Sequence, residues 1–232
     1  MGKRIIQQAR GHGSLTYRVR RRAYRYRVGY PVNGGKIKGD VLKILNSPGH
    51  SAPLVKIKAG KDIFFNVAAN ELREGQEIET NSDEIKNGNI VEIGKIPIGT
   101  KIFNIEVARG DGGKIIRTSG SYAVVTKKFP GKTAVFNLSK KEIIFKDNSR
   151  ATIGEIAASG RVDKPLTKAG TKWHMMKARN KLWPRTSAVK MNAVDHPFGS
   201  GRGKRIKSKI AKRNAPPGAR VGLLRPRRTG RR

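Results

Sequence analysis

Residues 102–107 read Ile-Phe-Asn-Ile-Glu-Val, and this stretch indicates the fold class. Apolar side chains occupy alternate positions from Phe103 to Val107, with Asn104 and Glu106 between them. Because successive side chains of a β-strand point to opposite faces, the alternation predicts a half-buried strand. Similar short runs rich in Val, Ile and Phe recur about every ten residues on both sides, as in all-β proteins. We therefore predict an all-β fold of small antiparallel barrels.

Gly, Asn, Pro, Asp and Ser separate these runs and mark the turns. The runs expected to form strands are Val41–Leu45, Leu54–Ile57, Ile63–Val67, Ile90–Ile93, Ile102–Val107, Tyr122–Thr126, Ala134–Leu138, Ile143–Phe145 and Thr152–Ile156. One helical turn is expected near Asn70–Glu74, and the polar run Asn81–Asn89 is expected to separate two barrels.

The charge is concentrated at the two ends of the chain. The 232 residues hold 51 Lys and Arg against 16 Asp and Glu, a net charge of +35. Residues 1–31 carry nine basic and no acidic side chains, residues 32–160 carry 20 against 14, and residues 161–232 carry 22 against two. Flanks of this composition cannot fold alone and order against a polyanion. We predict a basic extension over 1–35, barrels over 36–83 and 84–160, and a second basic extension over 161–232.

Several function classes are excluded or disfavoured. The chain has no cysteine, which excludes disulfides, thiolate metal sites and cysteine nucleophiles. Its four histidines lack metal-ligand spacing, and Gly131-Lys132-Thr133 lacks the first glycine of a phosphate loop. Asp195-His196 is the one pair that suggests acid–base chemistry, but no motif places a nucleophile beside it. We expect a soluble intracellular protein that is not an enzyme and needs no metal or cofactor.

The basic flanks favour nucleic-acid binding through phosphate contacts. Residues 17–27 interleave tyrosines with arginines, which pair with phosphate and stack on bases. Tyr24, Tyr26 and Tyr30 either offer faces to unpaired bases or pack against the first barrel. The glycine-rich loop 110–120, which carries Lys114 and Arg117, either brings backbone amides to phosphates or is a structural turn.

Four ordered segments carry a resemblance to a known family. They are Ser47–Leu54, Ile96–Thr100 followed by Gly112-Gly113, Arg117–Gly120, and Met191-Asn-Ala-Val-Asp-His-Pro-Phe-Gly199. Together they resemble large-subunit ribosomal protein two in its archaeal and eukaryotic branch, over nearly the whole chain. The resemblance implies an OB-fold domain followed by an SH3-like barrel, with basic extensions that enter large-subunit rRNA near the peptidyl transferase centre. It also implies assistance in subunit association and tRNA placement, with the chemistry left to RNA.

The resemblance also assigns particular residues. His50 falls where many family members carry an arginine implicated in rRNA contact, Arg117 follows the paired glycines, and His196 is the loop histidine nearest the catalytic RNA. The residues expected to contact RNA are Arg18, Arg20, Arg21, Arg22, His50, Lys114, Arg117, His196, Arg202, Lys204 and Arg205.

The expected partners are large-subunit rRNA, neighbouring ribosomal proteins and small-subunit rRNA at the subunit interface, in the cytoplasm and away from membranes. Charge alone allows a different class, an architectural DNA-binding or chromatin protein, although no helix-turn-helix or zinc-finger pattern is present. An RNA-processing enzyme that uses Asp195 and His196 is a third hypothesis.

Overall fold

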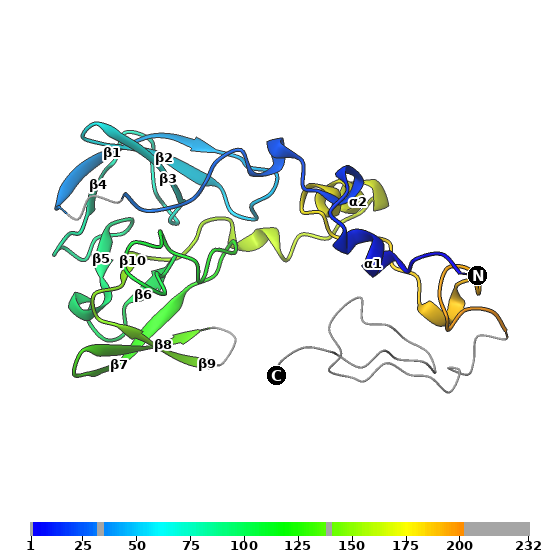
Figure 1. Ribbon diagram of the computed structural model, residues 1–232. Coiled ribbons are helices and arrows are strands. Elements are labelled where there is room, and N and C mark those ends of the chain that lie inside the picture. The colour runs from blue at the N-terminus through cyan, green and yellow to red at the C-terminus, as the bar shows by residue number, and fades with distance from the viewer. Residues whose placement is uncertain (1, 32–34, 138–140, 202–232) are drawn as a thin grey trace. The chain divides into compact units, whose positions relative to one another are not determined.

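The computed structural model describes residues 2–31, 35–137 and 141–201, and this part of the chain is mostly β-sheet with few helices (Figure 1). The strands are β1 (Ile37–Leu45), β2 (Leu54–Ala59), β3 (Asp62–Val67), β4 (Glu77–Thr80), β5 (Ile90–Glu92), β6 (Lys101–Phe103), β7 (Ala123–Phe129), β8 (Lys132–Asn137), β9 (Lys141–Lys146) and β10 (Arg150–Ile153). The α-helices are α1 (Ile6–Gly11) and α2 (Ala169–Ala178), and short 3₁₀ turns cover Leu15–Tyr17, Arg21–Tyr24, Ile93–Lys95, Ser159–Arg161 and Ala188–Lys190. The all-β prediction is confirmed at this level.

The strands form one continuous sheet in the order β3-β2-β1-β4-β5-β10-β6-β7-β8-β9. Neighbouring strands are antiparallel except β4 and β5, which are joined by one parallel pair, Thr80 with Ile90. In Figure 1 the sheet runs from β1–β3 at the top of the β region, through β5 and β10, to β7–β9 at the bottom. β1 and β7 each contain a register shift, between Val41 and Lys43 and between Val125 and Lys127. Such bulges increase the local bend and twist of a strand, which small curved sheets require.

Two hydrophobic cores share the middle strands of this sheet. Ile90 packs in a core with β1–β3, whereas the adjacent Val91 packs in a second core with β7–β9. In the same way, Phe103 packs in the first core and Ile102 packs in the second. Because neighbouring side chains of a strand point to opposite faces, β5 and β6 each contribute to both cores.

The segment 102–107 differs from its sequence-based expectation. β6 ends at Phe103, because Asn104 has a left-handed backbone with φ of 48°. The side chains of Asn104 and Glu106 are fully buried, whereas Val107 is 52% exposed. The two polar residues are buried because each has hydrogen-bond partners inside the protein, as described below.

Two other expectations were wrong in detail. Residues 70–74 form turns rather than a helical turn, and Glu71 has a positive φ of 63°. β4 was not expected, because Glu-Ile-Glu-Thr contains a single apolar residue. Ile78 nevertheless lies in the first core.

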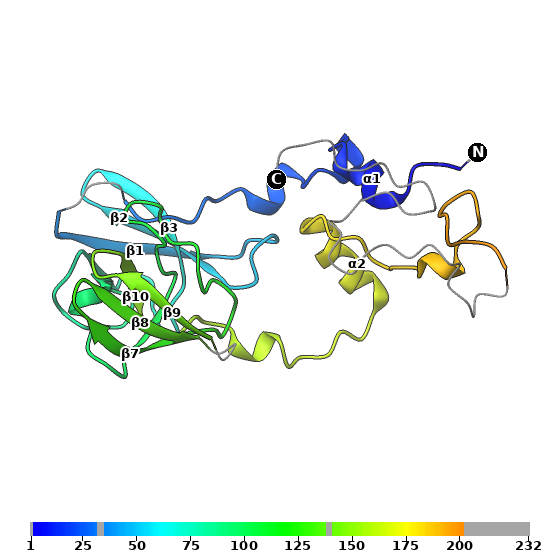
Figure 2. The same ribbon diagram turned by 60° about the horizontal axis from the view of Figure 1, so that its bottom comes forward.

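The described residues divide into two compact units. Residues 20–171 form the unit that contains the sheet, and residues 2–19 together with 172–201 form the other. The second unit is held by contacts between distant parts of the chain, including Lys3 N–H to Val194 O at 2.8 Å and Arg10 Nη2 to Asn180 O at 2.6 Å. Figure 2 shows the same elements from a second direction. Within the described ranges, no helix has the length and hydrophobicity needed to cross a bilayer.

Candidate nucleic-acid interface

An arginine-rich 3₁₀ turn, Arg21–Tyr24, is fixed to the loop that follows β1. Ala23 is its buried residue, and the Ala23 carbonyl accepts hydrogen bonds from Gly49 N–H at 2.7 Å and Ser47 Oγ at 3.3 Å. A Cβ at Gly49 would lie 2.3 Å from that carbonyl oxygen, so this approach requires glycine. Because Ala23 alone faces inward, the flanking arginines remain exposed.

His50 lies beside this turn and is half-buried. Its Nδ1 is 2.8 Å from Ser47 Oγ, and its ring meets the ring of Tyr24 edge-on at 5.1 Å. The sequence-predicted residues Arg20, Arg21, Arg22 and His50 are therefore brought together by the structure. Arg20, Arg21 and Arg22 are exposed to solvent.

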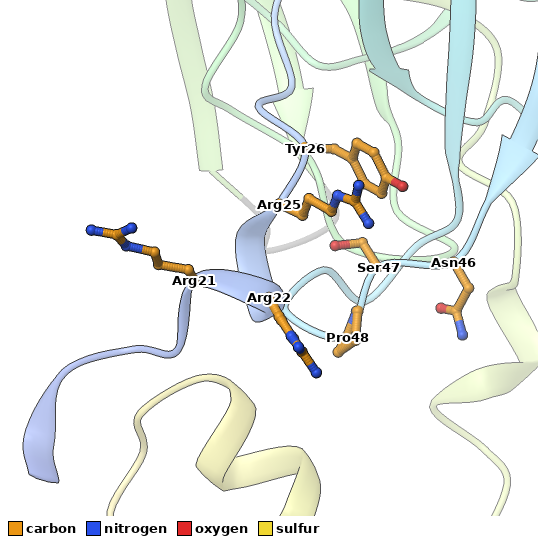
Figure 3. Close-up of a pocket in the computed structure, with 7 residues that line it drawn as sticks. All are labelled: Arg21, Arg22, Arg25, Tyr26, Asn46, Ser47 and Pro48. Carbon is orange, nitrogen blue, oxygen red and sulfur yellow. The ribbon is translucent and has the colours of Figure 1, made fainter.

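A pocket of about 530 Å³ opens between the turn and this loop (Figure 3). It is lined by Arg21, Arg22, Arg25, Tyr26, Asn46, Ser47 and Pro48. The sequence analysis did not single out Arg25 or Asn46. The alternating Tyr-Arg pattern was the available signal for Arg25, whereas nothing in the sequence brings Asn46 to the arginines.

The three tyrosines of this segment have different environments. Tyr30 is buried, and its hydroxyl donates to Asn104 O at 2.5 Å and lies 2.7 Å from Thr152 Oγ1. Burial raises the pKa of Tyr30 above its usual value, so the hydroxyl stays protonated. Tyr24 is 47% exposed and Tyr26 is half-buried. Tyr30 therefore packs within the first core and Tyr26 packs against it, whereas about half of Tyr24 is open to solvent.

The burial of Val28 and Tyr30 in the first core also bears on the N-terminal extension. Gly29 N–H donates to Phe65 O at 2.9 Å, and Val28 forms a β-bridge with Phe65. We expected the extension to order only against a polyanion. In the structure its last part, residues 28–30, makes contacts with the first core.

The glycine-rich loop uses its amides within the protein. The Glu106 carboxylate accepts hydrogen bonds from Gly110 N–H and Gly112 N–H, each at 3.2 Å. Asp111 accepts from three further amides, including Gly113 N–H at 2.9 Å. Burial by itself would raise the pKa of Asp111, but these hydrogen bonds hold that pKa below its usual value. Of the two readings of this loop, the structure favours the structural turn.

Arg117 points into the protein. Its Nε donates to Asn104 Oδ1 at 2.7 Å, and its Nη2 donates to the carbonyls of Val28, Gly112 and Gly113. Burial lowers the pKa of Arg117, but a guanidinium remains charged at neutral pH. Lys114, in contrast, is exposed and has Asp111 as an ion-pair partner at 3.5 Å. Arg117 thus connects the loop to the segment before Tyr30, and Lys114 faces solvent.

His196 lies in a tight turn of the other unit and is buried. Phe198 N–H donates to His196 Nδ1 at 3.1 Å, which places the proton of the neutral ring on Nε2. Burial lowers the pKa of His196, so the neutral form is favoured. A Cβ at Gly199 would lie 2.3 Å from Asn192 O, so the turn needs glycine there.

The remaining predicted residues lie elsewhere. Arg18 is exposed, and its Nε donates to Gly13 O at 2.6 Å within the second unit. Arg202, Lys204 and Arg205 lie outside the described residues.

In residues 2–31, 35–137 and 141–201, no group of three His, Asp or Glu side chains could hold a metal ion.

An all-β unit with exposed arginines on a protein-fixed turn, together with a second basic unit, is typical of a basic nucleic-acid-binding protein. Comparison with known proteins gives the family. Residues 86–218 match the family model described as Ribosomal Proteins L2, C-terminal domain. The chain belongs to the large ribosomal subunit protein uL2 family, in its archaeal branch.

Two relatives show how far the similarity extends. The chain is 43% identical over 240 residues to large ribosomal subunit protein uL2 of Methanococcus maripaludis, covering 100% of both chains. It is also 43% identical over 238 residues to large ribosomal subunit protein uL2 of Sulfolobus acidocaldarius, covering 100% of this chain and 99% of the relative.

Proposed function

We propose that this chain is a structural constituent of the large ribosomal subunit that binds large-subunit rRNA. The observation that carries the proposal is the similarity over the whole chain to large ribosomal subunit proteins. The exposed arginines of the turn and the net charge of +35 support it, because rRNA supplies the phosphates that offset such a charge. The chain performs no catalysis of its own.

In this proposal the sheet unit comprises two RNA-binding domains. Residues 36–83 form an OB-fold and residues 84–160 form an SH3-like barrel, between basic extensions over 1–35 and 161–232. Two features support two barrels: the two hydrophobic cores, to both of which β5 and β6 contribute, and the bulges in β1 and β7 that bend small sheets toward closure.

The exposed side chains make the phosphate contacts. Those in the described residues are Arg18, Arg20, Arg21, Arg22 and Lys114, all of which are open to solvent. Arg202, Lys204 and Arg205 join them on the basis of their sequence. His50, Arg117 and His196 act beside the RNA by holding the loops that meet it, as their hydrogen bonds to the protein suggest.

The site of action is the neighbourhood of the peptidyl transferase centre, where the chain supports subunit association and tRNA placement. Its partners are large-subunit rRNA, neighbouring ribosomal proteins and small-subunit rRNA at the subunit interface. Its location is the cytoplasm, as part of the ribosome. This part of the proposal rests on the family resemblance.

Affinity for two polyanions separates this function from architectural DNA binding. The purified chain is titrated with a large-subunit rRNA transcript and with duplex DNA of the same number of phosphates. We expect both affinities to fall as salt rises from about 50 to 200 mM, because counterions are released in both cases. At the higher salt the rRNA should bind at least about tenfold more tightly, because recognition of folded RNA shape adds to charge. Equal affinities would favour the architectural protein.

A further inference from the structure

We propose that the pocket between the arginine-rich turn and the loop after β1 holds one unpaired nucleotide of the bound RNA (Figure 3). The inference rests on the proposed function and assigns a ligand to one part of that surface. The volume of the pocket, about 530 Å³, lies within the range of clefts that bind small organic ligands, roughly 300–1,000 Å³.

The charge of the pocket matches a phosphate group. Three of its seven lining residues are arginines, Arg21, Arg22 and Arg25, and none of the seven is acidic. The segments that form the pocket, residues 17–31 and 46–54, contain no Asp or Glu. Guanidinium groups bind phosphate oxygens with paired hydrogen bonds, so the arginines can grip the backbone on either side of a nucleotide.

The pocket also has a surface suited to a base. The ring of Tyr26 packs against the ring of Phe65, with ring centroids 4.8 Å apart. The Arg25 guanidinium lies 5.8 Å from the centroid of the Tyr26 ring. Figure 3 shows Arg25 extending toward Tyr26, with Ser47 on the facing loop. A base stacks favourably on an aromatic ring or on a guanidinium plane. A phosphate alone needs no such surface.

Polar groups of the loop complete the site. Asn46 carries both a donor and an acceptor, and its side chain is exposed. The Watson–Crick edge of a base presents the same kinds of groups, and in a paired base that edge is already bonded to the partner strand. A nucleotide that has left its helix is therefore the ligand that uses all three features of the pocket.

Protein contacts hold the two sides of the pocket together. The turn is fastened to the loop by the bonds from Gly49 and Ser47 to Ala23 O, and Ala23 N–H itself bonds to Arg20 O at 2.9 Å. The backbone positions from which Arg21 and Arg22 project are therefore fixed by the protein itself. Preorganisation of this kind reduces the entropic cost of binding.

Zero-length ultraviolet crosslinking tests the proposal on the full chain bound to a large-subunit rRNA transcript. We expect a nucleotide adduct on Tyr26 or on a neighbouring pocket residue, located by mass spectrometry. Arg25→Ala should reduce the adduct yield by about fivefold or more, the lower end of what base stacking contributes. Arg73→Ala, which removes an exposed arginine outside the pocket, should leave that yield unchanged. Tyr26→Phe keeps the ring packed on Phe65 and should retain the adduct.

The outcomes separate this inference from the proposed function. If the chain binds the transcript and crosslinks elsewhere but never in the pocket, the inference is wrong and the proposed function stands. If Arg25→Ala weakens binding while no pocket adduct forms in the parent chain, the arginines contact phosphate only, and the nucleotide is again rejected. If the chain does not bind the transcript at all, the proposed function itself fails.

Discussion

Glu106 and Arg150 form a buried ion pair that connects three segments of the sheet unit. Their side chains are 0% and 3% exposed, and the guanidinium meets the carboxylate with two bonds, at 2.7 Å and 3.0 Å. Arg150 Nη1 also donates to Pro31 O at 2.9 Å. The same carboxylate accepts amide bonds from Gly110 and Gly112. The N-terminal segment, the glycine loop and β10 therefore meet at one charge pair.

Removing one charge of this pair should be costly. Glu106→Gln leaves the Arg150 guanidinium buried without its counter-charge, so we expect the free energy of unfolding to fall by about 3–5 kcal/mol. Urea denaturation of the purified chain measures it. Glu92→Gln is the matched control, because Glu92 pairs with Arg109 at the surface, and its loss should cost less than about 1 kcal/mol. Equal small losses for both variants would show that the buried pair does not hold these segments.

At the residue scale, the sequence pattern correctly identified the apolar positions of this segment but wrongly indicated which polar side chains face solvent. The alternation over 102–107 correctly marked apolar positions such as Phe103 and Ile105, which are buried. It placed Glu106 on the solvent face, because a lone glutamate in a short apolar run is normally exposed. The partner that makes burial tolerable, Arg150, lies 44 residues further along the chain, and no local pattern links the two.

Among the elements, the glycine loop shows how backbone conformation determines where side chains can act. Gly113 has φ of 78°, and a Cβ there would lie 2.4 Å from Asn104 O and 2.5 Å from Asn104 Oδ1. The close approach lets Arg117 reach both Asn104 and the Gly113 carbonyl. The loop is thus a packed structural element that presents Lys114 outward.

Two alanine substitutions in this loop should differ in their effect. Gly110 also has a positive φ, 88°, but nothing lies within 4 Å of a Cβ placed there. Gly110→Ala should therefore cost only the left-handed backbone penalty, about 1–2 kcal/mol. Gly113→Ala should cost at least about 1 kcal/mol more, because a backbone oxygen must also move. Thermal or urea unfolding measures both, and equal losses would contradict the close approach of Gly113 to Asn104.

The strands themselves were largely predictable, because runs of Val, Ile and Phe between turn residues are strong local signals. β2, β3 and β8 fall where those runs lie. β4 was missed because its pairing with β1, rather than its own composition, makes it a strand. The end of β6 at Phe103 was missed because the left-handed Asn104 is stabilised by Asn66 and Arg117, both distant in sequence.

For the whole molecule, the distribution of charge was the most informative property of the sequence. A nearly balanced middle and two basic flanks indicated a protein core bound to a polyanion, and family membership agrees with that reading. The sharing of β5 and β6 between two cores could not be read from the sequence. It depends on which face of the folded sheet each neighbouring residue meets, as for Ile90 and Val91.

The central claim is that this chain is an integral component of the large ribosomal subunit. Sedimentation tests it most directly: the tagged chain is expressed in an archaeal host, and ribosomal subunits are separated on sucrose gradients at low and moderate salt. We predict that the chain sediments with the large subunit and stays there after a moderate salt wash, because many phosphate contacts act together. Recovery of the chain near the top of the gradient, or with chromosomal DNA, at physiological salt would contradict the claim.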